Sequence, residues 1–139
     1  MHPVAEQTDE AFLADFLAAR LGKADFNHRG HLRAAWLLLQ RLPLDQAVEQ
    51  TCTGIRRLAA ALGAADKFHH TRTEALVRLM AQAGAADRTL GWETFLQRQP
   101  LLVRDARALL AQHYSPALLD SPEARLHFVA PDLRAWPGC

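Results

Sequence analysis

Apolar residues recur three and four positions apart along most of this chain, and no long stretch alternates between apolar and polar residues. An α-helix brings every third or fourth side chain to one face, whereas a β-strand brings every second side chain to one face. The pattern therefore predicts an all-α protein. Because 139 residues match one domain, we expect a compact single-domain bundle of about six helices over residues 1–139. We expect a short irregular C-terminal tail, with residues 1–7 and 133–139 loosely ordered.

Capping and turn residues divide the apolar pattern into segments. Asn27 is a suitable N-cap for a second helix, Pro43 stops that helix, and Gly63 supplies a left-handed residue after a third. Thr71 and Glu74 have the spacing of a capping box, in which a hydroxyl and a carboxylate bind the exposed N–H groups of a helix start. The expected helices span about 8–21, 27–42, 44–62, 71–83, 92–99 and 101–112, and a further short helix begins near 121.

The charge balance argues against nucleic acid and membrane partners. Sixteen Lys and Arg residues stand against fifteen Asp and Glu residues, which leaves a formal net charge of +1 and no basic excess to neutralise phosphates. No segment approaches the roughly 18 consecutive apolar residues of a membrane span, and the first residues lack the pattern of a signal peptide. Two cysteines, Cys52 and Cys139, do not form a disulfide framework. We therefore expect a cytoplasmic protein.

Histidine is the residue type that points most directly to function. The chain contains seven histidines and one tyrosine, and His28, His31, His69 and His70 form two close pairs. His28 and His31 lie three positions apart in the first turn of an expected helix, so their imidazoles leave the same face. The positive end of the helix dipole disfavours a protonated imidazole, and a neutral imidazole is a good metal ligand. The first pair can therefore supply two ligands of a metal centre.

A third ligand is expected from the second histidine pair, which precedes a later helix. His69 is the first candidate and His70 is the competitor, because two helix starts at one end of a bundle can face each other across a pocket. We predict that His28, His31 and His69 hold a divalent transition metal such as zinc, iron or copper. The alternative is that these histidines cap helix ends or form hydrogen bonds to backbone carbonyls. His70 is expected to be the solvated member.

Other polar residues are candidates for contacting a substrate, namely Arg33, Thr73, Tyr114 and Arg125. An arginine beside a metal can bind a carboxylate or phosphate through two hydrogen bonds, although such arginines more often belong to a solvated face. Tyr114 and Arg125 lie near short breaks after the last long helix, where a closing segment can reach back over the bundle. The alternative for Tyr114 is that its ring packs in the core and its hydroxyl binds the backbone.

Several motifs also resemble those of a known family. They are Phe26-x-His28-x2-His31-Leu32-Arg33-x-Ala35-Trp36, Lys67-Phe68-His69-x-Thr71-x-Thr73, Trp92-x2-Phe95, Tyr114-Ser115-x2-Leu118 and Ser121-x2-Ala124-Arg125. In this order and spacing, the chain resembles a family of small bacterial proteins described as hypothetical. The resemblance implies histidine at the positions of His28, His31 and His69, whereas the position of His70 is more often acidic in that family. It therefore favours His69 as the third ligand, and it implies no established activity.

Two functional hypotheses follow from these observations. The first is a metal-dependent enzyme with a three-histidine centre that acts on a small polar substrate. The second is a non-catalytic module that binds a small ligand or a protein, with histidines that are structural or hydrogen-bonding. Other chemistries have little support, because the chain lacks a Gly-rich phosphate loop and a nucleophile elbow, and Cys52 is expected to be an inert core thiol. A DNA-binding regulator would need a basic face, which the balanced charge does not provide.

Overall fold

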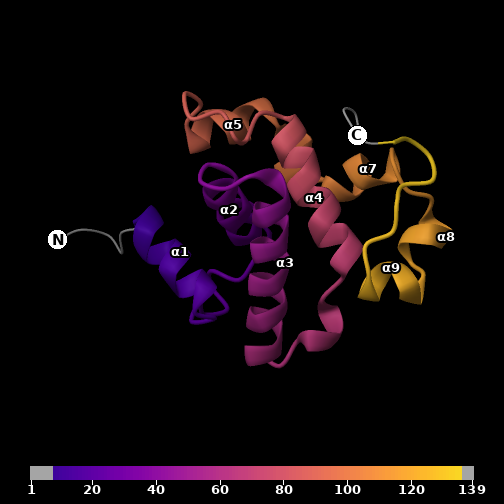
Figure 1. The fold of residues 1–139 in the computed structure, drawn as a ribbon, viewed down its shortest axis with the longest axis horizontal. Helices are drawn as coiled ribbons and strands as arrows, with labels where there is room; N and C mark the ends of the chain where they lie inside the picture. The colour runs from indigo at the N-terminus through magenta and orange to yellow at the C-terminus, as the bar shows by residue number, and fades with distance from the viewer. Residues whose placement is uncertain (1–7, 136–139) are drawn as a thin grey trace.

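The computed structural model describes residues 8–135, and within this range the protein is all-α, as predicted. The described residues form nine α-helices and one 3-10 helix, with no β-strand among them (Figure 1). The elements are α1 (Asp9–Leu17), α2 (His28–Leu39), α3 (Leu44–Ala61), the 3-10 helix η1 (Ala65–Lys67), α4 (His70–Gln82), α5 (Trp92–Arg98), α6 (Pro100–Arg104), α7 (Ala106–Ala111), α8 (Pro116–Leu119) and α9 (Pro122–Leu126).

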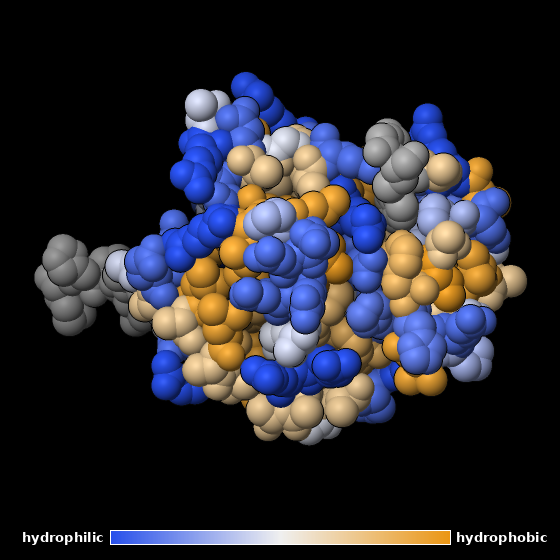
Figure 2. Space-filling view, viewed as in Figure 1, coloured by the Kyte–Doolittle hydropathy of each residue, from blue (hydrophilic) through white to orange (hydrophobic). Residues whose placement is uncertain are grey.

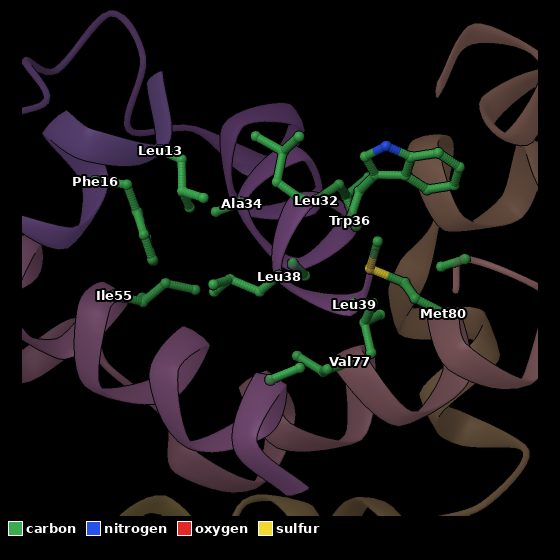
Figure 3. Close-up of a cluster of buried hydrophobic side chains, with 14 of the residues drawn as sticks. Leu13, Phe16, Leu32, Ala34, Trp36, Leu38, Leu39, Ile55, Val77 and Met80 are labelled. Atoms are coloured by element: carbon green, nitrogen blue, oxygen red, sulfur yellow. The ribbon is translucent and has the colours of Figure 1, made fainter. Parts of the chain in front are cut away.

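Helix α2 forms the centre of the core. Seven of its twelve residues are buried, and α1, α3 and α4 all pack against it. Figure 3 shows Leu38 and Leu39 of α2 gathered with Ile55 of α3 and with Val77 and Met80 of α4. Burial of apolar area is the main favourable contribution to folding, so this contact fixes the relative positions of the helices that carry the histidines.

Helices α1 and α3 approach each other closely at Gly54. A Cβ atom at this position would lie 2.4 Å from the ring of Phe16, so only glycine fits without movement of α1. Helix α1 ends at Leu17, before the expected end near residue 21, because Ala19 adopts a left-handed φ of 57°. The chain that follows still returns Leu21 to the core.

The helix expected over 101–112 is divided in two at Asp105. This residue adopts φ −153° and ψ 67°, outside the helical range, and its carboxylate accepts a hydrogen bond from the N–H of Ala108. Aspartate competes with the helical backbone in this way, which explains why α6 ends and α7 begins here. Ser121 caps α9 as expected, whereas α8, capped by Ser115, is not anticipated by the sequence pattern.

The capping box expected at Thr71 and Glu74 is wrong. His69 is the N-cap of α4, and its Nδ1 accepts a hydrogen bond from the N–H of Arg72 at 3.1 Å. The Thr71 hydroxyl instead donates to the carbonyl of His127 at 2.8 Å and accepts a hydrogen bond from the N–H of Val129 at 3.2 Å. A tertiary contact has therefore replaced the local cap.

The segment after α9 is irregular, as expected, and packs on α4 and α7. The buried Tyr114 donates its hydroxyl hydrogen bond to the carbonyl of Val129 at 2.7 Å, and the N–H of Leu133 donates to the carbonyl of His113 at 2.9 Å. These bonds tie the segment to the end of α7. The expectations for residues 1–7 and 136–139 lie outside the described range.

The surface mixes polar and apolar side chains. Figure 2 shows hydrophilic residues interspersed with apolar ones on the face that carries α3 and α4. The exposed large apolar side chains come from different elements, namely Leu17, Leu44, Leu101, Leu126 and Leu133. In the part of the chain that is described, no helix has both the length and the apolar character required to cross a membrane.

Candidate functional site

A cavity of about 390 Å³ lies among α2, α3, η1, α4 and α7, and all three histidines of the expected centre line it. His28 and His31 come from the first turn of α2, and His69 precedes the first turn of α4. Apolar side chains such as Ile55 and Leu110 form much of the remaining wall. A cavity of this size can enclose a small molecule. We call it the histidine cavity.

His28 and His31 differ in their hydrogen bonding. The Nε2 of His28 donates to the carbonyl of Leu102 at 2.7 Å, which anchors this imidazole to α6. The Nε2 of His31 is buried and has no hydrogen-bond partner, and its ring meets the edge of Phe26 with centroids 4.7 Å apart. Burial, and then the neighbouring His28, lower the pKa of His31 to about 4. His31 is therefore neutral at physiological pH.

Both ring nitrogens of His69 have partners within the protein. Its Nδ1 accepts from the N–H of Arg72 at 3.1 Å, so its Nε2 carries the proton and donates to the carbonyl of Leu119 at 2.7 Å. Burial lowers the pKa of His69, and the positive charge of Arg72 acts in the same direction, while the bond to Leu119 opposes them. A neutral His69 in this tautomer has no lone pair left for a metal.

Three buried polar atoms without hydrogen-bond partners occur among the described residues, and all three belong to residues that line the histidine cavity. They are Nε2 of His31, Oγ1 of Thr51 and Nε of Arg72. Native proteins pair nearly all buried polar atoms, and an unpaired one costs about 1–3 kcal/mol. Three such atoms around one cavity indicate a surface suited to a polar ligand.

The charges around the histidine cavity have one sign. Lys67, Arg72 and Arg107 line it, and within residues 8–135 no aspartate or glutamate does so. The guanidinium of Arg72 also lies 3.7 Å from the carboxylate of Asp120, whose side chain is largely exposed. An excess of cationic groups beside a cavity raises the local concentration of anions.

The structure distributes the predicted substrate residues over different parts of the molecule. Thr73 lines the histidine cavity, and its hydroxyl donates to the carbonyl of His69 at 2.9 Å. Arg33 lies at another cavity, pairs with Asp9 at 3.0 Å and covers the ring of Phe12.

Tyr114 and Arg125 also lie away from the lining of the histidine cavity. Tyr114 is buried with its hydroxyl bound to the backbone, and Arg125 is exposed on α9. Of the four predicted substrate residues, Thr73 alone shares the cavity with the histidines.

A second cavity of about 400 Å³ lies between different faces of α3 and α4, and we call it the thiol cavity. Cys52, His70 and Glu74 line it, and one potential ligand atom from each lies within 4.8 Å of the other two, the only such group among residues 8–135. His70 is not the solvated residue that we expected, because its side chain is only 24% exposed. Burial, followed by the carboxylate of Glu74, raises the pKa of Cys52 to about 12, so the free thiol is protonated.

No sequence motif described above singles out Thr51 or Arg72. Thr51 is a polar residue within the buried stripe of α3, and a buried polar residue in an apolar pattern is a signal for a site. Arg72 gives no comparable signal, because charged residues are usually exposed, and the side chain of Arg72 is itself 41% exposed.

The resemblance to a family of hypothetical bacterial proteins remains a prediction after comparison with known proteins. The chain matches no protein-family model, no curated protein and no solved structure.

Proposed function

We propose that this protein binds a small organic anion in the histidine cavity, with its anionic group near Thr51 and Arg72 and its apolar part against Ile55 and Leu110. The observation that carries the proposal is that the three buried, unpartnered polar atoms of the described residues all belong to residues that line this cavity. A ligand that supplies hydrogen-bond partners would remove the free-energy cost of leaving them unpaired.

A carboxylate is the ligand group that these atoms favour. The Nε of Arg72 and the hydroxyl of Thr51 can both donate a hydrogen bond, and a carboxylate accepts without donating. Lys67 and Arg107 add positive charge at the same cavity, which no carboxylate of the described residues lines. Neutral His31 can contribute a further hydrogen bond, with a role set by its tautomer.

The cavity supports a binding function better than a three-histidine metal centre. A metal at His69 would require the Nδ1 bond to Arg72 or the Nε2 bond to Leu119 to break. The bond from Nε2 of His28 to Leu102 leaves only Nδ1 of this imidazole for a metal, so the case against the centre rests on His69. The geometry therefore favours the hypothesis in which the histidines form hydrogen bonds and shape a pocket.

The test is binding of matched probes to the full-length protein, measured by NMR titration and calorimetry. The probes are hexanoate and phenylacetate, with hexanamide and phenylacetamide as neutral counterparts. We expect the carboxylates to bind more tightly than the amides, because only the carboxylates complement the cationic lining.

Two substitutions locate the binding site. Thr51→Val and Arg72→Met should each weaken carboxylate binding by about tenfold, the value of one hydrogen bond to a charged group. Thr53→Val is the matched control, because Thr53 lies on the same helix but lines the thiol cavity instead. Equal binding of acids and amides, no binding of either, or unchanged binding in both variants would each contradict the proposal.

A further inference from the structure

The thiol cavity is separate from the histidine cavity, although the two are adjacent along α3 and α4. Thr51 lines the histidine cavity and Cys52 lines the thiol cavity, and the same division separates His69 from His70. Consecutive residues of a helix point about 100° apart, so one helix can serve two cavities. The thiol cavity is therefore a separate candidate site.

We propose that Cys52, His70 and Glu74 bind a divalent transition metal, with zinc as the preferred ion. The potential ligand atoms of the three residues all lie within 4.8 Å of one another. Sulfur, imidazole nitrogen and carboxylate oxygen are the three ligand types that zinc uses in proteins. A thiolate in this set disfavours magnesium and calcium, which bind through oxygen.

The positions of His70 and Glu74 suit a tetrahedral ion. Nε2 of His70 and Oε1 of Glu74 lie 3.2 Å apart. Two ligands of a tetrahedral zinc ion with bond lengths of 2.0–2.1 Å are separated by about 3.3 Å. The two atoms therefore already have the spacing of two corners of a zinc site. A metal would take the place of the hydrogen bond between them, with the proton of His70 moved from Nε2 to Nδ1.

Arg78 fixes the orientation of the Glu74 carboxylate. Nε and Nη2 of Arg78 both donate to Oε2 of Glu74, at 3.0 and 2.9 Å, which leaves Oε1 directed at His70. The guanidinium of Arg78 is in turn held over the ring of Phe128, at 5.2 Å from its centroid. Metal-ligating carboxylates typically have such an outer hydrogen-bond partner, which holds the ligating oxygen in place.

Cys52 supplies the ligand that distinguishes this group from a surface ion pair. It is a free, buried cysteine on α3, opposite His70 and Glu74 of α4. A thiolate together with the Glu74 carboxylate balances the two positive charges of the ion, and metal binding releases the thiol proton to solvent. Three protein ligands leave the fourth tetrahedral position to water.

The test uses full-length, untagged protein carrying Cys139→Ser, so that Cys52 is its single thiol. The protein is stripped with a chelator and titrated with Co²⁺ under reducing conditions, and Zn²⁺ is then added in competition with a chromophoric chelator. We expect one equivalent of Co²⁺ to produce a thiolate charge-transfer band and the strong visible absorption of a tetrahedral ion. Zn²⁺ should displace it.

Substitutions assign the ligands. Cys52→Ala should abolish the charge-transfer band, and His70→Gln and Glu74→Gln should each weaken Zn²⁺ binding by more than about 100-fold, because loss of a direct ligand exceeds the effect of losing an outer partner. Thr53→Val is the matched control, since Thr53 lines the same cavity and adds no ligand of these types. Circular dichroism verifies that each variant is folded, and the variants on α4 keep the test decisive where Cys52→Ala is unstable.

Two results would overturn the proposal. One is the absence of a thiolate band at stoichiometric Co²⁺, which would leave His70, Glu74 and Arg78 as a structural ion-pair group. The other is Zn²⁺ affinity that is unchanged in His70→Gln and Glu74→Gln. Thr51→Val and Arg72→Met alter the histidine cavity and should leave Zn²⁺ binding intact. The metal proposal and the anion proposal can therefore be tested independently.

Discussion

The histidine cavity and the thiol cavity share two helices but differ in charge and in the pairing of their polar atoms. Among the residues that the structure describes, the histidine cavity is lined by cationic side chains and no carboxylate, and three of its lining residues have an unpartnered buried polar atom. The thiol cavity contains charges of both signs, namely Asp45, Glu49, Arg56, Glu74 and Arg78, and no unpartnered buried side-chain nitrogen or oxygen is found there among the described residues. The first surface suits an anion that brings its own hydrogen-bond acceptors, and the second offers an organised set of metal ligands.

The difference shows that residues adjacent in the sequence can belong to two sites with different chemical properties. Thr51 and Cys52 are neighbours, as are His69 and His70, and each pair is divided between the cavities. In a helix the two members of such a pair point in different directions. Adjacent histidines are thus poor evidence for a shared site, whereas residues three or four positions apart are better evidence.

The largest expected effect concerns pH and the histidine cavity. The pKa of His31 falls from 6.5 in an unfolded chain to about 4 in the folded protein. Above pH 6.5 the residue is neutral in both states, and as the pH falls the unfolded chain takes up a proton that the folded protein resists. Folding stability should therefore decrease between about pH 6.5 and pH 4, by about 3 kcal/mol in total from this residue.

Urea unfolding at pH 7.5 and pH 4 measures this loss. His31→Phe, which removes the titrating group and keeps an aromatic ring, should lose about 3 kcal/mol less stability over this interval than the parent protein. His127→Gln is the control for substitution of an exposed histidine. Equal losses in His31→Phe and the parent would show that the cavity does not exclude a charged imidazole.

The next effect tests whether the two cavities are independent. Arg78→Met removes the two hydrogen bonds that orient Glu74, so Zn²⁺ affinity should fall by about 10–100-fold, with no change in hexanoate binding. Arg72→Met should do the opposite, because Arg72 lines the histidine cavity. The measurements are Zn²⁺ competition and hexanoate calorimetry on both variants. If either substitution weakens the binding of both Zn²⁺ and hexanoate, the two cavities are not independent sites.

Local signals in the sequence were sufficient to predict most of the main helices. Asn27 caps α2, Gly63 follows α3 with a φ of 73°, and Ser121 caps α9, each as expected. One failure has a local cause, since Asp105 divides the helix expected over 101–112, and another has a tertiary cause. Thr71 does not cap α4, because its hydroxyl binds a carbonyl 56 positions away, and no local pattern reveals such a contact.

The candidate sites were harder to predict than the helices. Histidine spacing directed attention to the residues that line the histidine cavity, but it did not reveal that both nitrogens of His69 bind the protein. The thiol cavity was missed because Cys52 and His70 are 18 positions apart on two helices whose facing surfaces depend on packing. Periodicity predicts which face of a helix is buried, and it does not predict which residues of another helix it meets.

The smallest effect concerns the stability of the protein without ligand. Thr51→Val replaces an unpartnered buried hydroxyl by a methyl group of similar shape, so the unfolding free energy should rise by about 1 kcal/mol. Thr53→Val, on the half-buried side of the same helix, should give no comparable increase, and urea unfolding of the two variants measures the difference. A hydroxyl that lowers stability when unpartnered and strengthens carboxylate binding is expected of a binding residue. A loss of stability in Thr51→Val would instead mark Thr51 as part of the structural core. Its hydroxyl would then no longer count among the three unpartnered atoms that distinguish the histidine cavity from the thiol cavity.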